Sequence, residues 1–337
     1  MTIECIGVVV HHGKQAALSA AEVVWDWARR SGRNCVELDV WDKPETDLDS
    51  IPDLIVTVGG DGTFLRGVRA GAGSAGTCGS LVLGIDVGRV GFLTEVTVAD
   101  IPTALDAVCR GDYQVDERMV LTARASRPLI VPPEVDAVIR YSRGPLYPPR
   151  HARPAPAESN GSGVLLNFAA LNDIVFEKLA RDRQASLAVY VMGRRFASYS
   201  ADALIVSTPT GSTAYNFAAG GPILSPSMDA LVFTPVAPHM IFDRSLVLGG
   251  DQEVALRVLE QSGPVTVSVD GQLRGVIEAG DWVSVFAGPN RARLVRMKDT
   301  DFLARVRERF GLTDAAAALA DGSAPENLDA GAPPGQS

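Results

Sequence analysis

Cysteine, basic charge and long apolar runs are all scarce in this chain of 337 residues. The four cysteines stand too far apart for a zinc knuckle or a redox motif, which favours reduced thiols in a cytoplasmic protein; they are Cys5, Cys35, Cys78 and Cys109. No run approaches the roughly 18 apolar residues of a membrane-spanning helix. Lysine and arginine together number 31 against 40 acidic residues, and the net charge of −9 argues against a nucleic-acid partner.

Two nucleotide-binding motifs are also missing. The sequence contains no G-x-x-x-x-G-K-[ST], which excludes a Walker-type site. No G-x-G-x-x-G follows the first apolar run, where the sequence reads HHGKQA, and this excludes a dehydrogenase of the Rossmann type. The N-terminal stretch MTIECIGVVV has no basic residue ahead of its apolar run and is expected to be a strand, not a signal peptide.

What is present suits a globular protein of two domains, since 46% of the residues are hydrophobic and 21% are charged. In the first part, strand-like apolar runs alternate with stretches whose apolar residues recur every three or four positions. This alternation predicts a parallel α/β sheet with right-handed crossovers. Strands are expected at 6–10, 34–40, 53–58 and 81–85, and helices at 14–30, from 64 onwards and at 101–109.

The pattern changes in the second part. Residues 126–163 contain eight prolines, which predicts a surface insertion. A last amphipathic helix is expected at 302–310, and residues 313–337, without lysine or arginine, are expected to be a disordered tail. Between the insertion and this helix, short β-rich runs separated by turn residues predict an antiparallel β domain, with strands at 164–170, 186–191, 203–207, 246–248, 254–259, 265–269 and 282–287.

The strongest local signal is VTVGGDGTFLRGVR at 56–69. Its glycines leave bare backbone N–H groups at the carboxyl end of a strand, where a helix begins, and a phosphate can bind there. A carboxylate in such a loop would repel the phosphate unless Asp61 accepts a proton from an attacking hydroxyl or helps to hold a metal ion on the phosphates. The alternative is an ordinary Asp-Gly turn, which the strand–GGDGT–helix context disfavours. The motif therefore indicates a kinase-like phosphate site.

Two further segments carry polar groups that suit a nucleotide. Asn172 and Asp173 are adjacent after a strand-like run, and an amide beside a carboxylate can both donate to and accept from sugar hydroxyls. Residues 200–226 contain a strand that ends in a loop rich in glycine and threonine, followed by a short helix bearing Tyr215, whose ring could lie against a base.

With these segments in place, the chain resembles the NAD kinase family. The resemblance covers roughly residues 5–120 and 165–312 and rests on GGDGTFLR, GIDVGRVGFLTEV, LNDIV, TPTGSTAYNFAAGGP, TPVAPHM and VDGQ. It implies a Rossmann-like α/β domain of the NAD kinase/diacylglycerol kinase type at 1–120, completed by the C-terminal helix at 297–312. It also implies an antiparallel all-β, NAD-binding domain at 121–296.

The resemblance further implies an activity: transfer of the γ-phosphoryl group of ATP to the 2′-hydroxyl of the adenosine ribose of NAD, with Mg²⁺ on the phosphates. Asp61 matches the family's general base, and Gly60, Gly62 and Thr63 match the loop along the phosphates, while Arg66 and Arg69 are candidate phosphate partners. The remaining matches to nucleotide-binding positions are Phe92, Asn172, Asp173, Asp202, Thr213, Ala214 and Tyr215. No residue is assigned as a metal ligand.

The chain departs from the family at two of these places. Asp173 stands where many members have Glu, and Phe217-Ala218 replaces a Lys-Ser pair. His239, among apolar residues, is interpreted as structural. Asp270-Gly271-Gln272 has the local pattern of a β-turn, and its match to the family raises the chance of a contact near the site.

Three functions are compatible with parts of this pattern. An NAD kinase, a homo-oligomer (dimer or tetramer) by its resemblance, accounts for every motif. A lipid kinase of the diacylglycerol type shares GGDGT but is expected to lack TPTGSTAYN, and a non-catalytic dinucleotide-binding regulator would need no base. The arginine-rich insertion is interpreted either as a solvated flap or as a basic rim or subunit contact.

Overall fold

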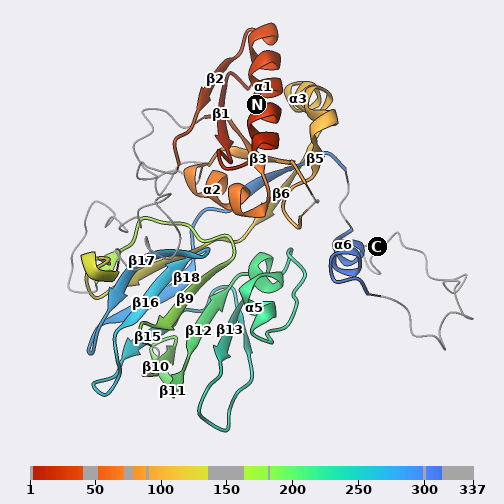
Figure 1. Cartoon of the computed structure of the whole chain (residues 1–337). Coiled ribbons are helices and arrows are strands. Elements are labelled where there is room, and N and C mark those ends of the chain that lie inside the picture. The colour runs from red at the N-terminus through yellow and green to blue at the C-terminus, as the bar shows by residue number, and fades with distance from the viewer. Residues whose placement is uncertain are drawn as a thin grey trace, which may run out of the picture. The chain divides into compact units, whose positions relative to one another are not determined.

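The structure is a computed structural model that describes residues 3–40, 52–71, 79–88, 91–135, 163–180, 183–298 and 301–312. The chain divides into two compact units, Met1–Asp299 and Thr300–Ser337 (Figure 1). Most of the expected insertion, at 136–162, and the expected tail at 313–337 lie outside the described residues.

The first part of the chain builds a mixed sheet in the order β2-β1-β3-β4-β19-β6, with β5 beside β4. All strand pairs are parallel except β19 with β6. The strands are β1 (Cys5–Val10), β2 (Asn34–Glu37), β3 (Leu54–Gly59), β4 (Leu81–Asp86), β5 (Val96–Thr97), β6 (Gln114–Arg118) and β19 (Ala292–Arg296).

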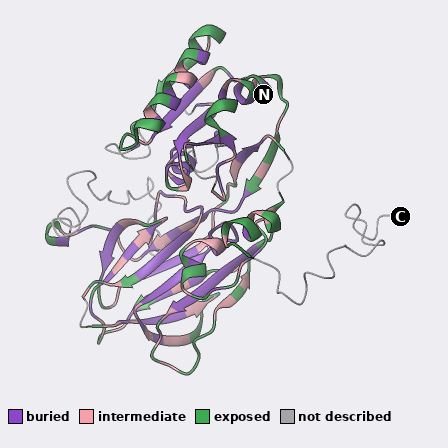
Figure 2. Cartoon of the chain, turned by 45° about the vertical axis from the view of Figure 1, so that its right-hand side comes forward, coloured by how far each residue is buried: buried purple, intermediate pink, exposed green. Residues whose placement is uncertain are grey.

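Helices cover both faces of this mixed sheet, and the alternation along β3 shows why its sequence is continuously apolar. Val56 and Val58 belong to the core that includes α1 (Gln15–Ser31) and α3 (Ile101–Arg110), whereas Ile55 belongs to the core that includes α2 (Asp61–Gly71). In Figure 2 the strands are largely buried, while the long α1 keeps exposed residues on its outer side. A short 3-10 turn, η1 (Val98–Asp100), precedes α3.

The second part is a β-sandwich of two antiparallel six-stranded sheets. One sheet has the order β11-β10-β15-β18-β7-β8, with strands β7 (Leu121–Ala125), β8 (Val164–Leu165), β10 (Ala185–Val191), β11 (Arg194–Ala201), β15 (Val254–Val258) and β18 (Trp282–Ala287). The other has the order β14-β13-β12-β9-β16-β17, with strands β9 (Asp173–Lys178), β12 (Ala203–Ser207), β13 (Ala230–Val236), β14 (Leu246–Gly249), β16 (Val265–Val269) and β17 (Gln272–Ile277).

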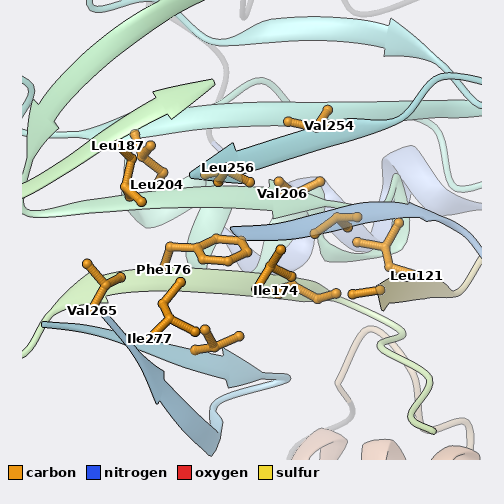
Figure 3. Packing of buried hydrophobic residues seen from close by; sticks show 14 of the residues in the cluster. Leu121, Ile174, Phe176, Leu187, Leu204, Val206, Val254, Leu256, Val265 and Ile277 are labelled. Carbon is orange, nitrogen blue, oxygen red and sulfur yellow. The ribbon is translucent and has the colours of Figure 1, made fainter. Parts of the chain in front are cut away.

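One hydrophobic core joins the two sheets of the sandwich. Leu187 and Leu256 come from the first sheet, and Phe176, Leu204 and Val265 come from the second; all five are at most 1% exposed (Figure 3). Inward-facing residues alternate with partly exposed ones along β7 and β16, as the pleat requires. The predicted fold class, an α/β domain followed by an antiparallel β domain, is therefore confirmed.

The structure differs from the sequence expectations in three places. Ala292–Arg296, which the sequence assigns to the second domain, form β19 and pair with β4 and β6 of the mixed sheet. The run at 164–170 is a strand only at Val164–Leu165, so Asn172 and Asp173 lie at the start of β9 and not after a strand. The predicted surface insertion has a buried beginning, since Leu129 and Val131 are 1% and 3% exposed.

The C-terminal unit contains the expected helix, α6 (Phe302–Arg309). Asp301 caps its N-terminus by accepting a hydrogen bond from the Ala304 N–H. The association of this helix with the first domain stays a prediction.

Candidate functional site

The GGDGT segment lies where β3 passes into α2, as the sequence predicts. Gly59 ends the buried strand, Gly60 connects, and Asp61 is the first residue of the helix. The N–H groups of Thr63 and Phe64 bond to the Gly60 carbonyl and close the first turn. The carboxyl end of a central parallel strand thus meets a helix N-terminus, and its amides point where an anion can bind.

A second loop holds the Asp61 side chain in place. The Phe92 N–H donates to Oδ2 at 3.0 Å and the Leu93 N–H donates to Oδ1 at 3.1 Å. The chain approaches Asp61 so closely at Gly91 that a Cβ there would lie 2.1 Å from Oδ1. Each carboxylate oxygen therefore has one backbone donor and keeps a further acceptor position. An oriented carboxylate of this kind can take a proton from a hydroxyl placed against it.

The other loop residues differ in what they offer a ligand. A Cβ at Gly60 or Gly62 would meet no atom of the described residues within 4 Å, so the backbone is uncrowded on that side of both glycines. Thr63, in contrast, is 2% exposed, and its hydroxyl lies against Gly59 without a hydrogen-bond partner among the described residues. The open face of the loop is therefore formed by backbone, and the Thr63 side chain belongs to its packed side.

The two arginines of α2 turn toward the sandwich. Arg69 is buried, and its Nη1 forms an ion pair with Asp270 at 3.1 Å. The side-chain amide oxygen of Gln272 accepts hydrogen bonds from both Arg66 and Arg69. The expectation that Arg69 contacts phosphate is therefore not met by its placement, because its guanidinium is engaged by the turn between β16 and β17. Arg66 is only partly buried.

Asp173 is the first residue of β9 and Asn172 immediately precedes it, in a tightly held segment. The Thr208 N–H and the Ser207 hydroxyl donate to the Asn172 carbonyl, at 2.9 and 3.1 Å. The Asp173 carboxyl is buried, and burial together with the nearby charge of Asp270 raises its pKa to about 7. Asp173 is thus a proton donor or acceptor near neutral pH, while the backbone of the segment is fixed.

The TPTGSTAYN segment folds into the 3-10 turn η2 (Thr210–Thr213) and the single-turn helix α5 (Tyr215–Ala218). Thr208 connects it to the previous segment, because its hydroxyl donates to the Leu171 carbonyl at 2.6 Å and accepts from the Gly211 N–H at 2.9 Å. A Cβ at Gly211 would lie 2.1 Å from the Asn172 carbonyl oxygen, so at this point the two segments touch backbone to backbone. They therefore form one continuous surface.

Tyr215 stands on this surface with an exposed fraction of 39%, next to the partly buried Thr213 and Ala214. Burial raises the pKa of the Tyr215 hydroxyl, and the carboxylates of Glu177, Asp173 and Asp202 raise it further. The ring is consequently an accessible, neutral aromatic face in acidic surroundings. Asp202 forms an ion pair with Lys178, and both side chains are partly exposed.

Two arginines that the sequence analysis did not single out link the mixed sheet to η2. Arg118 of β6 donates to the Thr210 hydroxyl at 3.3 Å and pairs with Asp116. Arg296 of β19 also pairs with Asp116 and donates to the Leu93 carbonyl at 3.0 Å, beside the loop that holds Asp61. Burial alone would raise the pKa of Asp116, but Arg118 and Arg296 lower it below its usual value. Only the strand pairing of β6 with β19 assembles this network, which leaves no local sequence signal.

Among the described residues, no group of three or more His, Cys, Asp and Glu side chains could hold a metal ion. The Asp61 carboxylate, which keeps an acceptor position on each oxygen, suits a contact with an Mg²⁺ ion on substrate phosphates, because Mg²⁺ is commonly held by phosphates and one or two carboxylates. No helix in the described part of the chain is long and apolar enough to cross a membrane.

Comparison with known proteins identifies the same two regions. Residues 39–113 match the ATP-NAD kinase N-terminal domain and residues 171–297 match the ATP-NAD kinase C-terminal domain. NAD kinase 1 of Streptomyces avermitilis is 55% identical over 331 residues, which cover 96% of this chain and 92% of that protein. NAD kinase of Heliobacterium modesticaldum is 36% identical over 313 residues, 90% of this chain and 98% of that protein.

Solved structures share the fold at lower identity. Yeast NADH kinase complexed with NADH has a TM-score of 0.74 at 20% identity and covers 93% of this chain and 89% of its own. An NAD kinase from Archaeoglobus fulgidus in complex with ATP has a TM-score of 0.61 at 21% identity and covers 91% of this chain and 97% of its own.

Proposed function

The chain belongs to the NAD kinase family and is an ATP-dependent NAD kinase, and on this premise we propose that Asp61 is its general base. The observation that carries the proposal is the pair of backbone hydrogen bonds that orient the Asp61 carboxylate at the start of α2, next to the uncrowded glycines Gly60 and Gly62. The enzyme transfers the γ-phosphoryl group of ATP to NAD, and NADP is the product.

The proposed reaction is a single phosphoryl transfer. The 2′-hydroxyl of the adenosine ribose gives its proton to Asp61 as its oxygen bonds to the γ-phosphorus, and the bond from that phosphorus to the bridging oxygen of ADP breaks. The amides at the start of α2 lie along the phosphates, where they face developing negative charge. Magnesium would come bound to the phosphates of ATP and would neutralise their oxygens there.

The nucleotide NAD is proposed to lie along the surface made by β9, η2 and α5. Asn172 and Asp173 would hold the hydroxyls of the nicotinamide ribose, and Asp202 would lie near the nicotinamide end. Thr213, Ala214 and the exposed ring of Tyr215 would contact the adenine and its ribose. Phe92, half-buried beside the Asp61 loop, would border the same pocket, and Arg66 would approach the phosphates.

The test is an assay of NADP formation from NAD, ATP and Mg²⁺ by the purified protein and by Asp61→Asn. A lost general base costs about 10²–10⁴-fold in kcat, whereas NAD binding, measured by calorimetry, should persist. Asp112→Asn is the matched control, because Asp112 forms only an exposed ion pair with Arg110. An Asp61→Asn enzyme with undiminished kcat would refute the role of Asp61.

A lipid kinase is not favoured, because the TPTGSTAYN segment is present and both family domains match NAD kinases. The same assay with diacylglycerol in place of NAD should give no product. Lipid phosphorylation without NADP formation would overturn the assignment.

We also propose that the enzyme is a homo-oligomer, a dimer or tetramer, in the cytoplasm. Its support is an exposed apolar group on the sandwich: Ile241 is fully exposed, and the rings of Phe242 and Phe196, at 39% and 43% exposure, stack edge to face. Light scattering coupled to size exclusion should give a multiple of 35.6 kDa, and Ile241→Asp should shift the mass toward one chain. A wild-type monomer would contradict the proposal.

A further inference from the structure

We infer that Asp270 is a positioning residue whose buried carboxylate fixes the segment Leu171–Asp173 relative to α2, the helix that begins with Asp61. The sequence alone treats this residue as part of a turn. The inference deepens the proposed function of the site and assigns a task to a group that does not itself reach the open surface.

The turn between β16 and β17 explains only in part why residue 270 is an aspartate. Asp270 and Gly271 join β16 to β17, with Val269 paired to Gln272 and with φ angles of +46° and +72°. A two-residue hairpin turn with both central residues in the left-handed region favours Asn-Gly as much as Asp-Gly. The turn therefore needs a short polar side chain, and it gives no reason for a negative charge.

The surroundings of the carboxylate supply that reason. It is fully buried, and three consecutive backbone N–H groups donate to it: Leu171 at 3.1 Å, Asn172 at 2.8 Å and Asp173 at 3.2 Å. The fourth donor is Nη1 of Arg69, at 3.1 Å. A carboxylate that accepts from three successive amides dictates the path of that backbone, and a charged acceptor strengthens each of these bonds.

Arg69 connects Asp270 to α2, the helix that packs on the mixed sheet; we call the contact between Arg69 and Asp270 the Asp270 link. Its side chain is 2% exposed and comes from α2, eight residues after Asp61, so the two are about 12 Å apart along one rigid helix. Arg69 also donates to Gln272, the residue that follows the turn. A movement of Asp270 would therefore change the distance between the Asn172–Asp173 segment and the base.

The charges at this link are balanced by one cation. Asp173 and Asp270 are two buried carboxyls close enough for the second to raise the pKa of the first, and Arg69 is the positive group paired with Asp270. An amide at position 270 would keep the shape and the turn. It would leave Arg69 without its carboxylate and present an NH₂ group toward backbone or guanidinium donors.

The experiment compares Asp270→Asn with Asp281→Asn at saturating NAD and ATP. Asp281 is the matched control, because it also pairs with an arginine, Arg127, and also accepts a hydrogen bond from the backbone in the sandwich. Among the described residues, its contacts lie away from the site. We expect Asp270→Asn to lower kcat by about 10–100-fold, since small misplacements of reacting groups have effects of this size. Asp281→Asn should lower Tm and leave kcat unchanged. A kcat within twofold of wild type for folded Asp270→Asn would overturn the inference.

A double-mutant cycle separates positioning from general destabilisation. Arg69→Gln and Asp270→Asn should each lower kcat, and the double variant should be no worse than the worse single variant, because both changes break one link. Fully multiplicative losses would contradict the link. If Asp270→Asn does not fold, Arg69→Lys keeps the charge but cannot reach both Asp270 and Gln272, and it should lower kcat in the same direction. If Asp61→Asn kept its activity, only the role of Asp61 as general base would be refuted. Losses of kcat at Asp270 and Arg69 would still support the contact between these two residues as the one that positions the site.

Discussion

At the scale of single residues, the site contains two aspartates in opposite surroundings. Asp61 is partly exposed and held by two backbone donors, so its free acceptor positions face the open loop. Asp173 is buried close to another carboxylate, which raises its pKa to about 7. The Asp61 carboxylate is thus oriented to accept a proton, whereas ionisation of the Asp173 carboxyl is unfavourable in the folded protein.

The raised pKa of Asp173 predicts that the stability of the protein depends on pH. In the unfolded chain the carboxyl ionises at its usual pKa of 3.8, whereas in the folded chain it stays protonated up to about pH 7. Between these values the folded state binds one proton more, so the free energy of unfolding falls as pH rises. Asp173→Asn should therefore be increasingly more stable than wild type from pH 4 to pH 7. Urea unfolding of both proteins at pH 5 and pH 8 measures the difference.

Asp281 provides a control, because its pKa is shifted in the opposite direction to that of Asp173. Burial alone would raise its pKa, but the Glu278 N–H, Arg127 and Ser126 lower it overall. Asp281→Asn should therefore lose stability relative to wild type at neutral pH, and the loss should shrink on acidification below about pH 4. A difference for Asp173→Asn that does not change with pH would contradict its raised pKa.

A pair of glycines near Asp61 predicts two distinct kinetic effects. A Cβ at Gly91 would lie 2.1 Å from the Asp61 carboxylate and must displace it, so Gly91→Ala should lower kcat by about 10²-fold or more. A Cβ at Gly60 meets open space, so Gly60→Ala should leave Tm nearly unchanged and raise the KM for ATP, whose phosphates are proposed to lie along this loop. Steady-state kinetics of both variants test this. Equal effects on kcat would argue against a base at Asp61.

At the scale of elements, η2 and α5 depend on one buried amide. The Asn216 NH₂ group donates to the carbonyls of Ser212 and Pro222, at 3.1 and 3.0 Å, and its oxygen accepts from the Thr234 hydroxyl at 2.7 Å. Such short helices have little stability of their own, so their shape comes from these bonds.

Replacing this amide should loosen the whole segment. Asn216→Ala removes three hydrogen bonds, and the Thr234 hydroxyl keeps its contact with Ser245 while the carbonyls of Ser212 and Pro222 lose the amide donor. We expect the free energy of unfolding to fall by about 2–4 kcal/mol, with a weaker affinity for NAD. Ser225→Ala, which removes an exposed hydroxyl contact with Ser227, should change stability by less than about 0.5 kcal/mol. Chemical denaturation and NAD calorimetry measure both. An Asn216→Ala protein with normal NAD affinity would show that the segment keeps its shape without the amide.

Periodicity predicted β1 to β4 and the helices α1 to α3 because each one has its own local pattern. The strand and helix on either side of Asp61 were expected within a few residues of β3 and α2. Strands β5, β6 and β19 of the mixed sheet and β7, β9, β11, β13 and β17 of the sandwich were not predicted. In β6 and β17 the apolar alternation is broken by buried polar residues, Arg118 and Arg274. The strand expected at 164–170 is limited to Val164–Leu165, because Leu166, Phe168 and Ala170 are buried, and so look apolar in sequence, without belonging to a strand.

The Asp270 link shows what no local pattern contains. Arg69 and Asp270 are 201 residues apart in the chain, and each has an ordinary local interpretation, as a helix residue and a turn residue. Only the pairing of β16 with β9 brings the turn to the segment that begins with Leu171. The residues of the site were therefore predictable from motifs, but the contacts that hold them were not.

At the scale of the molecule, the beginning of the insertion belongs to the sandwich. Arg127 pairs with Asp281, and Val131 and Val135 form a small core with Val276 of β17. The Ile130 carbonyl accepts from the Val276 N–H, which extends the sheet by one bridge. These residues cover β17, the strand that follows Asp270, so removing them would expose β17.

Two deletions should consequently behave differently. Replacing residues 136–162 by a short Gly/Ser linker retains every described contact of 127–135, and we expect an unchanged Tm and kcat. Deleting 127–160 also removes Leu129, Val131 and Val135, whose burial contributes about 1.5–3 kcal/mol each, and should lower the free energy of unfolding by at least about 3 kcal/mol. Calorimetric melting and NADP formation compare the two. Equal stability would mean that the buried beginning adds nothing to the sandwich, and loss of kcat in the shorter deletion would place 136–162 in the working enzyme.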